Sequence, residues 1–200
     1  ATINYLYLDL EHVVYFNGMT WKVVNTEVRT VKCFSSRDGG GIGAIAVNKE
    51  KQIVAVAESG HKPSIYFYQH PEYETINQLK GGTERSYCSI AFSNDGSKLA
   101  SVGSYPDYSL VIWNWKENSI LLRVKAFSQE IYNVSFSKYS NSCLCTSGLA
   151  HIKFWKVSNT FTGLKLKGEV GKFGSVELSD IRDMTMLSDG NTISGSENGY

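Results

Sequence analysis

The sequence has almost no net charge and no long apolar run, and each absence removes a class of partner. Its 200 residues carry 20 Lys and Arg against 19 Asp and Glu. No sequence-wide positive field therefore exists to hold a nucleic-acid backbone or an anionic membrane surface. The longest apolar runs, such as residues 53–57, fall far short of the roughly 18 residues that a membrane-spanning helix needs. We expect neither nucleic acid nor membrane as a partner.

The four cysteines have neither the paired spacing of a zinc site nor the density of a disulfide scaffold. They are Cys33, Cys88, Cys143 and Cys145, and each stands in a run that reads as a strand. A reduced thiol in such a run packs as a small hydrophobic side chain. We therefore expect a cytoplasmic type of compartment, where thiols stay reduced.

What the sequence does contain is an internal repeat of about 45 residues. Residues 90–115 and 134–155 share one layout, which is an apolar strand, a polar turn, a small-residue strand and an apolar strand ending in Trp. Residues 90–115 read IAFSNDGSKLASVGSYPDYSLVIWNW, and residues 134–155 read VSFSKYSNSCLCTSGLAHIKFW. Short strands at this period are typical of one fold, so we predict an all-β protein, a WD40-type β-propeller.

Two sets of apolar positions define the repeat. The first strand of each unit has apolar residues at alternate positions, which lie on one face of a strand. These pairs are Ile45 and Val47, Ile90 and Phe92, Val134 and Phe136, and Met184 and Met186. The third strands place a bulky residue at Val24, Tyr68, Trp113 and Trp155. We predict that the last four are structural repeat positions inside the blades.

Counting the units predicts about three complete blades and two partial ones within residues 1–200. The divisions are a divergent blade at 1–36, blades at 40–80, 86–126 and 131–167, and an incomplete blade at 180–200. A propeller closes with roughly four to eight blades. An open blade edge would leave unpaired backbone groups in water. We therefore expect these residues to be part of a larger protein.

The WD signature itself is degenerate. The Trp-Asp pair is present only as Trp113-Asn114 and Trp155-Lys156, and the Gly-His pair that should precede each first strand is missing. We therefore expect repeated packing, more than a repeated side-chain hydrogen-bond network, to hold the blades together.

Three segments resemble one family of WD-repeat proteins. Residues 100–137, 151–155 (HIKFW) and 160–174 (TFTGLKLKGEVGKFG) are similar to the cilia- and flagella-associated WD-repeat proteins of the axoneme. The resemblance implies a non-catalytic scaffold in motile cilia or flagella. It would dock on doublet-microtubule proteins and tether inner-arm dynein, together with a related ciliary WD-repeat protein. The HIKFW run is also similar to the echinoderm microtubule-associated-protein-like family, which implies a cytoplasmic tubulin-binding protein as the alternative.

A third class, a dinucleotide-dependent enzyme, is suggested by residues 41–46. GIGAIA fits the G-x-G-x-x-A fingerprint, and Glu58 lies near the distance of a ribose-binding acid. A true fingerprint opens a helix, but a Lys-Glu-Lys turn follows within a few residues and leaves no room for one. We expect residues 39–43 to form an inter-blade loop, with no cofactor.

The four histidines could in principle form a metal or general-base site. They are His12, His61, His70 and His151, and none has a second His or Cys at ligand spacing. We expect the strand register to keep them apart. No nucleophile elbow, Walker loop or H-E-x-x-H motif occurs. We predict no catalytic residues, no metal ligands and no enzyme.

A contact surface is the better candidate for a functional site. Loops that join second to third strands, and fourth strands to the next blade, open on one face of a propeller. The side chains that they carry are His61, Lys62, Tyr105, Pro106, Asp107, Tyr108, Phe127 and Gln129. Exposed aromatic side chains are favoured at interfaces, but Tyr105 and Tyr108 could equally pack on neighbouring loops. The insertion at 168–179 is either a second contact or a disordered loop.

Overall fold

The computed structural model describes residues 5–199, and within them it contains strands and no helix. Residues 1–4 of the first predicted blade and Tyr200 of the last lie outside this part of the chain. No helix able to cross a bilayer occurs among the described residues. The prediction of an all-β protein is confirmed.

Four four-stranded sheets and one two-stranded sheet follow one another in chain order, and every pairing is antiparallel. The first sheet contains β1 (Leu6–Tyr7), β2 (His12–Asn17), β3 (Thr20–Asn25) and β4 (Thr30–Ser35). The second contains β5 (Ile42–Asn48), β6 (Ile53–Glu58), β7 (Ile65–Gln69) and β8 (Glu74–Leu79). The third contains β9 (Tyr87–Phe92), β10 (Leu99–Gly103), β11 (Ser109–Asn114) and β12 (Ser119–Lys125). The fourth contains β13 (Ile131–Ser137), β14 (Ser140–Gly148), β15 (His151–Thr160) and β16 (Gly163–Val170), and β17 (Ile181–Met186) pairs with β18 (Thr192–Ser196).

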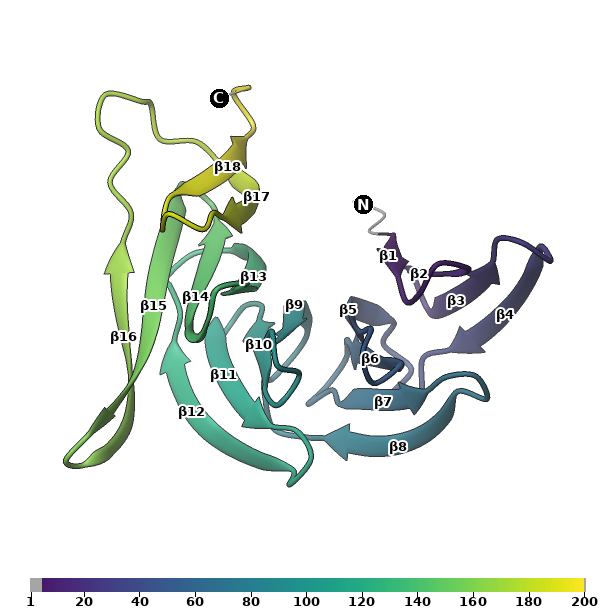
Figure 1. Cartoon of the computed structure of the whole chain (residues 1–200). Helices are drawn as coiled ribbons and strands as arrows, with labels where there is room; N and C mark the ends of the chain where they lie inside the picture. The colour runs from purple at the N-terminus through teal and green to yellow at the C-terminus, as the bar shows by residue number, and fades with distance from the viewer. Residues whose placement is uncertain (1–4, 200) are drawn as a thin grey trace.

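The sheets lie along an open arc as blades of a WD40-type propeller (Figure 1). The first strands β5, β9, β13 and β17 line the inside of the arc, and the fourth strands lie on its outside (Figure 1). The exposure of the strands is lowest in the middle of a blade and highest at its outer edge. Strands β6 and β10 are buried along their whole length, whereas β4 and β16 are mostly exposed. Small and β-branched side chains in β6 and β10 fit the crowded middle of a blade.

The second, third and fourth sheets each have a neighbouring sheet on both faces, and this explains the alternation in their first strands. In β5, Ile45 and Val47 pack into the core shared with the first sheet, whereas Ala44 and Ala46 pack into the core shared with the third. Ile90, on β9, likewise lies in the core shared with the preceding sheet. Adjacent residues of one strand therefore serve two different cores, because successive side chains point to opposite faces.

The segment predicted as a divergent blade forms a four-stranded sheet, because Leu6–Tyr7 adds a short first strand. The structure thus has four four-stranded sheets where the sequence indicated about three complete blades. In this first sheet Trp21 and Val23 are buried against the second sheet. Val24 points to the other side and is only half-buried. It faces the side on which the described residues place no blade.

The predicted insertion at 168–179 is shorter in the structure. Residues 168–170 belong to β16, which forms a long hairpin with β15. The rest is an irregular segment that packs on the fourth and fifth sheets. Gly171 donates its N–H to the Ile152 carbonyl at 2.8 Å, and Phe173 lies against the core of Ile181 and Met184.

Candidate functional site

The loop face comprises residues 36–41, 59–64, 80–86, 104–108 and 126–130, which join second to third strands and successive sheets. Backbone hydrogen bonds connect these loops, and the corresponding segments around Leu149, Asp180 and Glu197 in the fourth and fifth sheets, in the same way in four sheets. The donors and acceptors are Ser59 N and Gly41 O (2.8 Å), Ser104 N and Ser86 O (2.8 Å), Leu149 N and Glu130 O (2.9 Å), and Glu197 N and Asp180 O (3.0 Å). The loops are therefore held in place by main chain, so their side chains stand on a fixed frame.

The two tyrosines of the third sheet differ in their surroundings. Tyr105 is 63% exposed, and its ring meets that of Tyr108 edge-on, with 6.3 Å between ring centroids. Tyr108 is half-buried and packs against the core between the third and fourth sheets. Pro106, between them, is exposed. Tyr105 and Pro106 are therefore the accessible part of this loop, and Tyr108 supports it from beneath.

Asp107 binds groups inside the protein. Its carboxylate accepts hydrogen bonds from Thr83 Oγ1 at 2.9 Å and from Ser109 Oγ at 2.5 Å. The Glu84 N–H lies 3.4 Å from the same carboxylate. Asp107 thus connects the 104–108 loop to the 80–86 loop. Neither the composition nor the motif spacing of the sequence predicted this contact.

The remaining predicted contact residues are spread along the loop face. His61 and Lys62 are exposed, and Lys62 N donates to the Glu84 carbonyl at 2.9 Å. Gln129 is exposed as well. Phe127 stacks on His151, with centroids 3.7 Å apart and planes 13° from parallel. The structure thus brings residues 105–108 together and links 61–62 to them through Glu84, but it places Phe127 in a packing role.

Burial gives His151 the character of a core residue. The side chain is 1% exposed, and its Nδ1 lies 3.0 Å from the Leu149 carbonyl, so Nδ1–H is the donor. Burial lowers the pKa of His151, although the Leu149 contact works in the opposite direction. A neutral, stacked imidazole is therefore expected here.

The repeat positions carry a polar bond as well as packing. Trp113 and Trp155 are buried, as is Tyr68. The indole N–H of Trp113 donates to Ser101 Oγ at 2.8 Å, and that of Trp155 donates to Thr146 Oγ1 at 3.0 Å. The expectation was that packing contributes more than a repeated side-chain hydrogen-bond network, and these two blades have one such bond each beside the packing. The signal was present, because Ser101 and Thr146 each stand two residues after the strand leucine that pairs with the tryptophan.

The glycine fingerprint lies in a strand. Residues 42–48 form β5, and the next element is the strand β6 in place of a helix. A Cβ added to Gly43 would meet the Tyr87 carbonyl oxygen at 2.1 Å, so glycine is required there for close approach of two strands. Glu58 is buried and accepts hydrogen bonds from Ser36 Oγ, Arg37 N and Asp38 N. It orders the loop before β5, and its oxygens are engaged.

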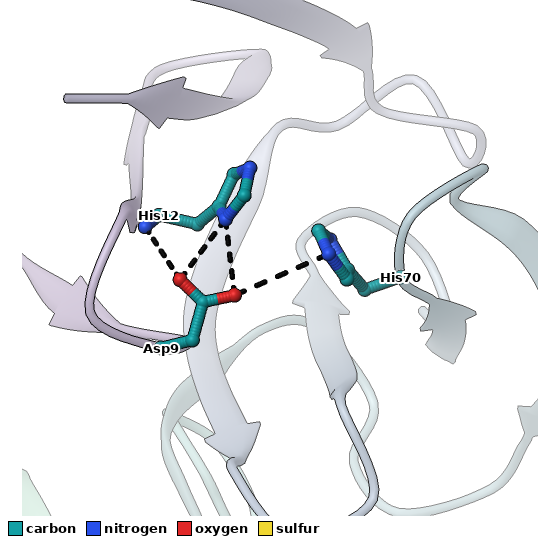
Figure 2. A group of neighbouring side chains, drawn as sticks. All are labelled: Asp9, His12 and His70. Atoms are coloured by element: carbon teal, nitrogen blue, oxygen red, sulfur yellow. Dashed lines mark hydrogen bonds and ion pairs between the residues drawn. The ribbon is translucent and has the colours of Figure 1, made fainter. Parts of the chain in front are cut away.

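The expectation that strand register separates the histidines is wrong for two of them. His12 begins β2 in the first sheet and His70 follows β7 in the second, yet their rings are 4.6 Å apart. Asp9 lies between them and completes the histidine cluster, Asp9, His12 and His70 (Figure 2). Register fixes neighbours within a sheet, whereas this contact is set by how two sheets pack. All three side chains are partly exposed.

Backbone hydrogen bonds hold the Asp9 carboxylate in place independently of the two imidazole rings. Its Oδ1 accepts the N–H of Glu11 at 2.8 Å and of His12 at 2.7 Å. His12 Nδ1 lies 2.9 Å from Oδ1 and 3.0 Å from Oδ2, and His70 Nε2 lies 4.0 Å from Oδ2. Partial burial raises the pKa of Asp9, but the hydrogen bonds from Glu11 and His12 outweigh it, and the pKa lies below its ordinary value.

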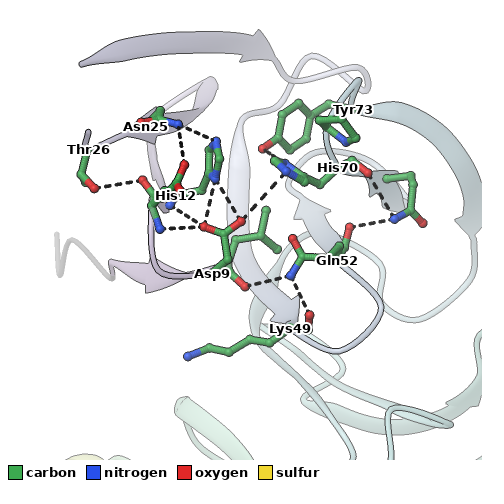
Figure 3. Close-up of polar contacts among 12 residues, drawn as sticks. Asp9, His12, Asn25, Thr26, Lys49, Gln52, His70 and Tyr73 are labelled. Atoms are coloured by element: carbon green, nitrogen blue, oxygen red, sulfur yellow. Dashed lines mark hydrogen bonds and ion pairs between the residues drawn. The ribbon is translucent and has the colours of Figure 1, made fainter. Parts of the chain in front are cut away.

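Polar neighbours fix the orientation of both imidazoles (Figure 3). Asn25 Oδ1 accepts the N–H groups of Glu27 and Val28, so the Asn25 amide nitrogen faces His12 Nε2 at 3.1 Å. His12 therefore carries its proton on Nδ1, directed at Asp9. The Tyr73 hydroxyl lies 2.7 Å from His70 Nδ1.

No protein-family model matches the chain. It is 48% identical over 170 residues (82% of the chain) to cilia- and flagella-associated protein 44 of Chlamydomonas reinhardtii. It is 43% identical over 194 residues (97%) to the mouse protein of the same name. In each case the match covers 10% of the relative. A weaker similarity, 24% over 98% of the chain, joins it to a quarter (25%) of rat echinoderm microtubule-associated protein-like 1.

Proposed function

The chain is related in sequence to cilia- and flagella-associated protein 44 over most of its length, and from this premise we propose that it is a non-catalytic scaffold of the axoneme in motile cilia or flagella. In this role it docks on doublet-microtubule proteins and takes part in tethering inner-arm dynein, together with a related ciliary WD-repeat protein. The observation that carries the proposal is the identity of 43–48% to these relatives.

The loop face supports the binding part of the proposal. Its loops are joined by main-chain hydrogen bonds, so a partner meets a surface that is already ordered and loses little conformational freedom on binding. Tyr105 offers a large aromatic side chain at low entropic cost, and such side chains dominate the energy of interfaces. We propose that His61, Lys62, Tyr105, Pro106 and Gln129 form the contact surface.

The test replaces Tyr105 with Ala in the full-length protein in a ciliated cell. If Tyr105 is an interface anchor, the loss of about 2 kcal/mol weakens partner binding about 30-fold, and incorporation into the axoneme falls. Tyr139→Ala is the matched control, because Tyr139 is 61% exposed but stands in the β13–β14 turn, away from the loop face. Tyr108 is left unchanged, since its ring supports the core and its removal would confuse folding with binding.

Normal incorporation of Tyr105→Ala would rule out this loop as the docking surface. Equal loss for Tyr105→Ala and Tyr139→Ala would show a general effect of removing surface tyrosines and would also count against it.

The second candidate is a cytoplasmic tubulin-binding protein, favoured by the similarity to the microtubule-associated relative. The location of the tagged full-length protein separates the two. Signal along motile cilia supports the axonemal role. Signal on cytoplasmic or spindle microtubules, with none in cilia, would replace it with the second.

A further inference from the structure

The histidine cluster joins two sheets through groups that commonly bind metal ions. Asp9 and His12 belong to the first sheet and its β1–β2 turn, and His70 belongs to the β7–β8 turn of the second. One ligand atom from each lies within 4.8 Å of the others. Two imidazoles and a carboxylate are a donor set that suits Zn²⁺ and other divalent first-row cations.

We propose that Asp9, His12 and His70 bind one Zn²⁺ ion, which fastens the first sheet to the second. Tetrahedral zinc holds its nitrogen and oxygen ligands at about 2.0–2.2 Å, which places ligand atoms about 3.4 Å from one another. His12 Nδ1 already lies 3.0 Å from Asp9 Oδ2. The separation of 4.0 Å between His70 Nε2 and Asp9 Oδ2 has to shorten by about 0.6 Å.

Hydrogen bonds to other groups orient the Asp9 carboxylate and the His70 imidazole for metal binding. Asp9 Oδ1 is occupied by two backbone N–H groups, which leaves Oδ2 for an ion. The Tyr73 hydroxyl can accept a hydrogen bond from His70 Nδ1–H, so that the lone pair of Nε2 points toward Asp9. A hydrogen bond on the distal nitrogen is the usual way in which a metal-binding imidazole is oriented.

The cavity beside the cluster has space for the remaining ligand. It measures about 60 Å³ and is lined by His12, Asn25, Lys32, His70 and Tyr73, among others. A water molecule needs roughly 10–15 Å³ of such space, so water can complete a three-residue site. The Lys32 ammonium is held by the Pro71 carbonyl at 2.9 Å and lies over the Tyr73 ring. Its positive charge reduces the affinity for a cation.

Asn25 sets the affinity of the site through His12. Zinc at Nδ1 moves the single ring proton to Nε2, where the Asn25 amide nitrogen, itself a donor, now stands at 3.1 Å. A carboxylate at position 25 would accept a hydrogen bond from His12 Nε2–H and could still accept hydrogen bonds from the N–H groups of Glu27 and Val28. Such a carboxylate–histidine pair typically changes metal affinity by about 10- to 100-fold. Asn25→Asp is therefore expected to bind zinc about tenfold more tightly than the parent chain.

The test measures zinc binding to the 200-residue chain by calorimetry and by competition with a chromophoric chelator. It is made in a Cys33→Ser background, because Cys33 is an exposed thiol that could bind zinc itself. One ion per chain is expected. Asp9→Asn and His70→Gln should each weaken binding about 100-fold, and Asn25→Asp should strengthen it about tenfold. His61→Gln, an exposed histidine on the loop face, is the control and should bind as the parent does.

Three results would overturn the proposal. One is the absence of zinc binding by both the parent chain and Asn25→Asp at a 100-fold excess of zinc over protein. Another is binding that is unchanged in folded His70→Gln. The third is an Asn25→Asp variant that binds more weakly than the parent. Zinc should also raise the melting temperature of the parent and of Asn25→Asp but not of Asp9→Asn, which a site elsewhere on the chain would not reproduce.

Discussion

The indole nitrogen of Trp113 lies 2.8 Å from the hydroxyl oxygen of Ser101, on the neighbouring strand of the same sheet. Both groups are buried. The bond therefore satisfies two polar groups that water cannot reach, and it fixes the rotamer of a large side chain in the core between the second and third sheets.

We expect Trp113→Ala to lower the free energy of unfolding by about 3–5 kcal/mol, because it empties a large buried volume. Trp113→Phe keeps most of the ring and loses the donor, so its cost should be about 1–2 kcal/mol. Urea denaturation followed by tyrosine fluorescence and circular dichroism measures both. Equal stability of Trp113→Ala and the parent would show that the core of the second and third sheets does not depend on this side chain.

Gly43→Ala should destabilise the protein by about 1–3 kcal/mol, since the added Cβ would meet the Tyr87 carbonyl oxygen at 2.1 Å. Gly195→Ala is the matched control, because a Cβ there has no neighbour within 4 Å and the backbone is not left-handed. It should leave stability unchanged or raise it by up to about 1 kcal/mol. Thermal melts of both variants test the difference. A neutral Gly43→Ala would mean that the two strands can separate at no cost.

Glu58→Gln is predicted to loosen the loop that precedes β5. Both carboxylate oxygens accept hydrogen bonds, Oε2 from Ser36 and Asp38 and Oε1 from Arg37. An amide turns one of these acceptors into a donor, which opposes a backbone N–H and costs about 1–3 kcal/mol. Limited proteolysis should then cut within residues 36–41 faster than in the parent. Unchanged cleavage would show that other contacts hold this loop.

Thiol reactivity should divide the cysteines by burial. Burial raises the pKa of Cys88 to about 12 and that of Cys145 to about 11. A pKa above its ordinary value lowers the thiolate fraction at pH 8, by about 100-fold for Cys145, whose ordinary value is 9.0. Iodoacetamide at pH 8 should therefore label the exposed Cys33 first, the partly buried Cys88 more slowly, and the buried Cys145 only in urea. Mass spectrometry reads the order, and rapid native labelling of Cys145 would contradict it.

The strands could be predicted because their signal is local. Ile90 and Phe92 alternate within one strand, and the Asp95-Gly96 turn follows them directly, so neighbouring residues carry the information. The contact between His12 and His70 had no such signal. The two residues are far apart in the chain and meet because two sheets pack face to face, and that geometry depends on side chains such as Trp21 and Tyr68 in the shared core. The internal role of Asp107 was missed for a similar reason, since its partner Thr83 lies on a different loop.

The recurring hydrogen bond between paired loops, as from Ser104 N to Ser86 O, uses only main-chain atoms. Almost any amino acid can supply those atoms, proline at the donor position being the exception. The outward side chains of the loop face are therefore interchangeable without altering the frame beneath them. New binding specificities can be grafted onto such a surface one loop at a time, while the fold stays as it is.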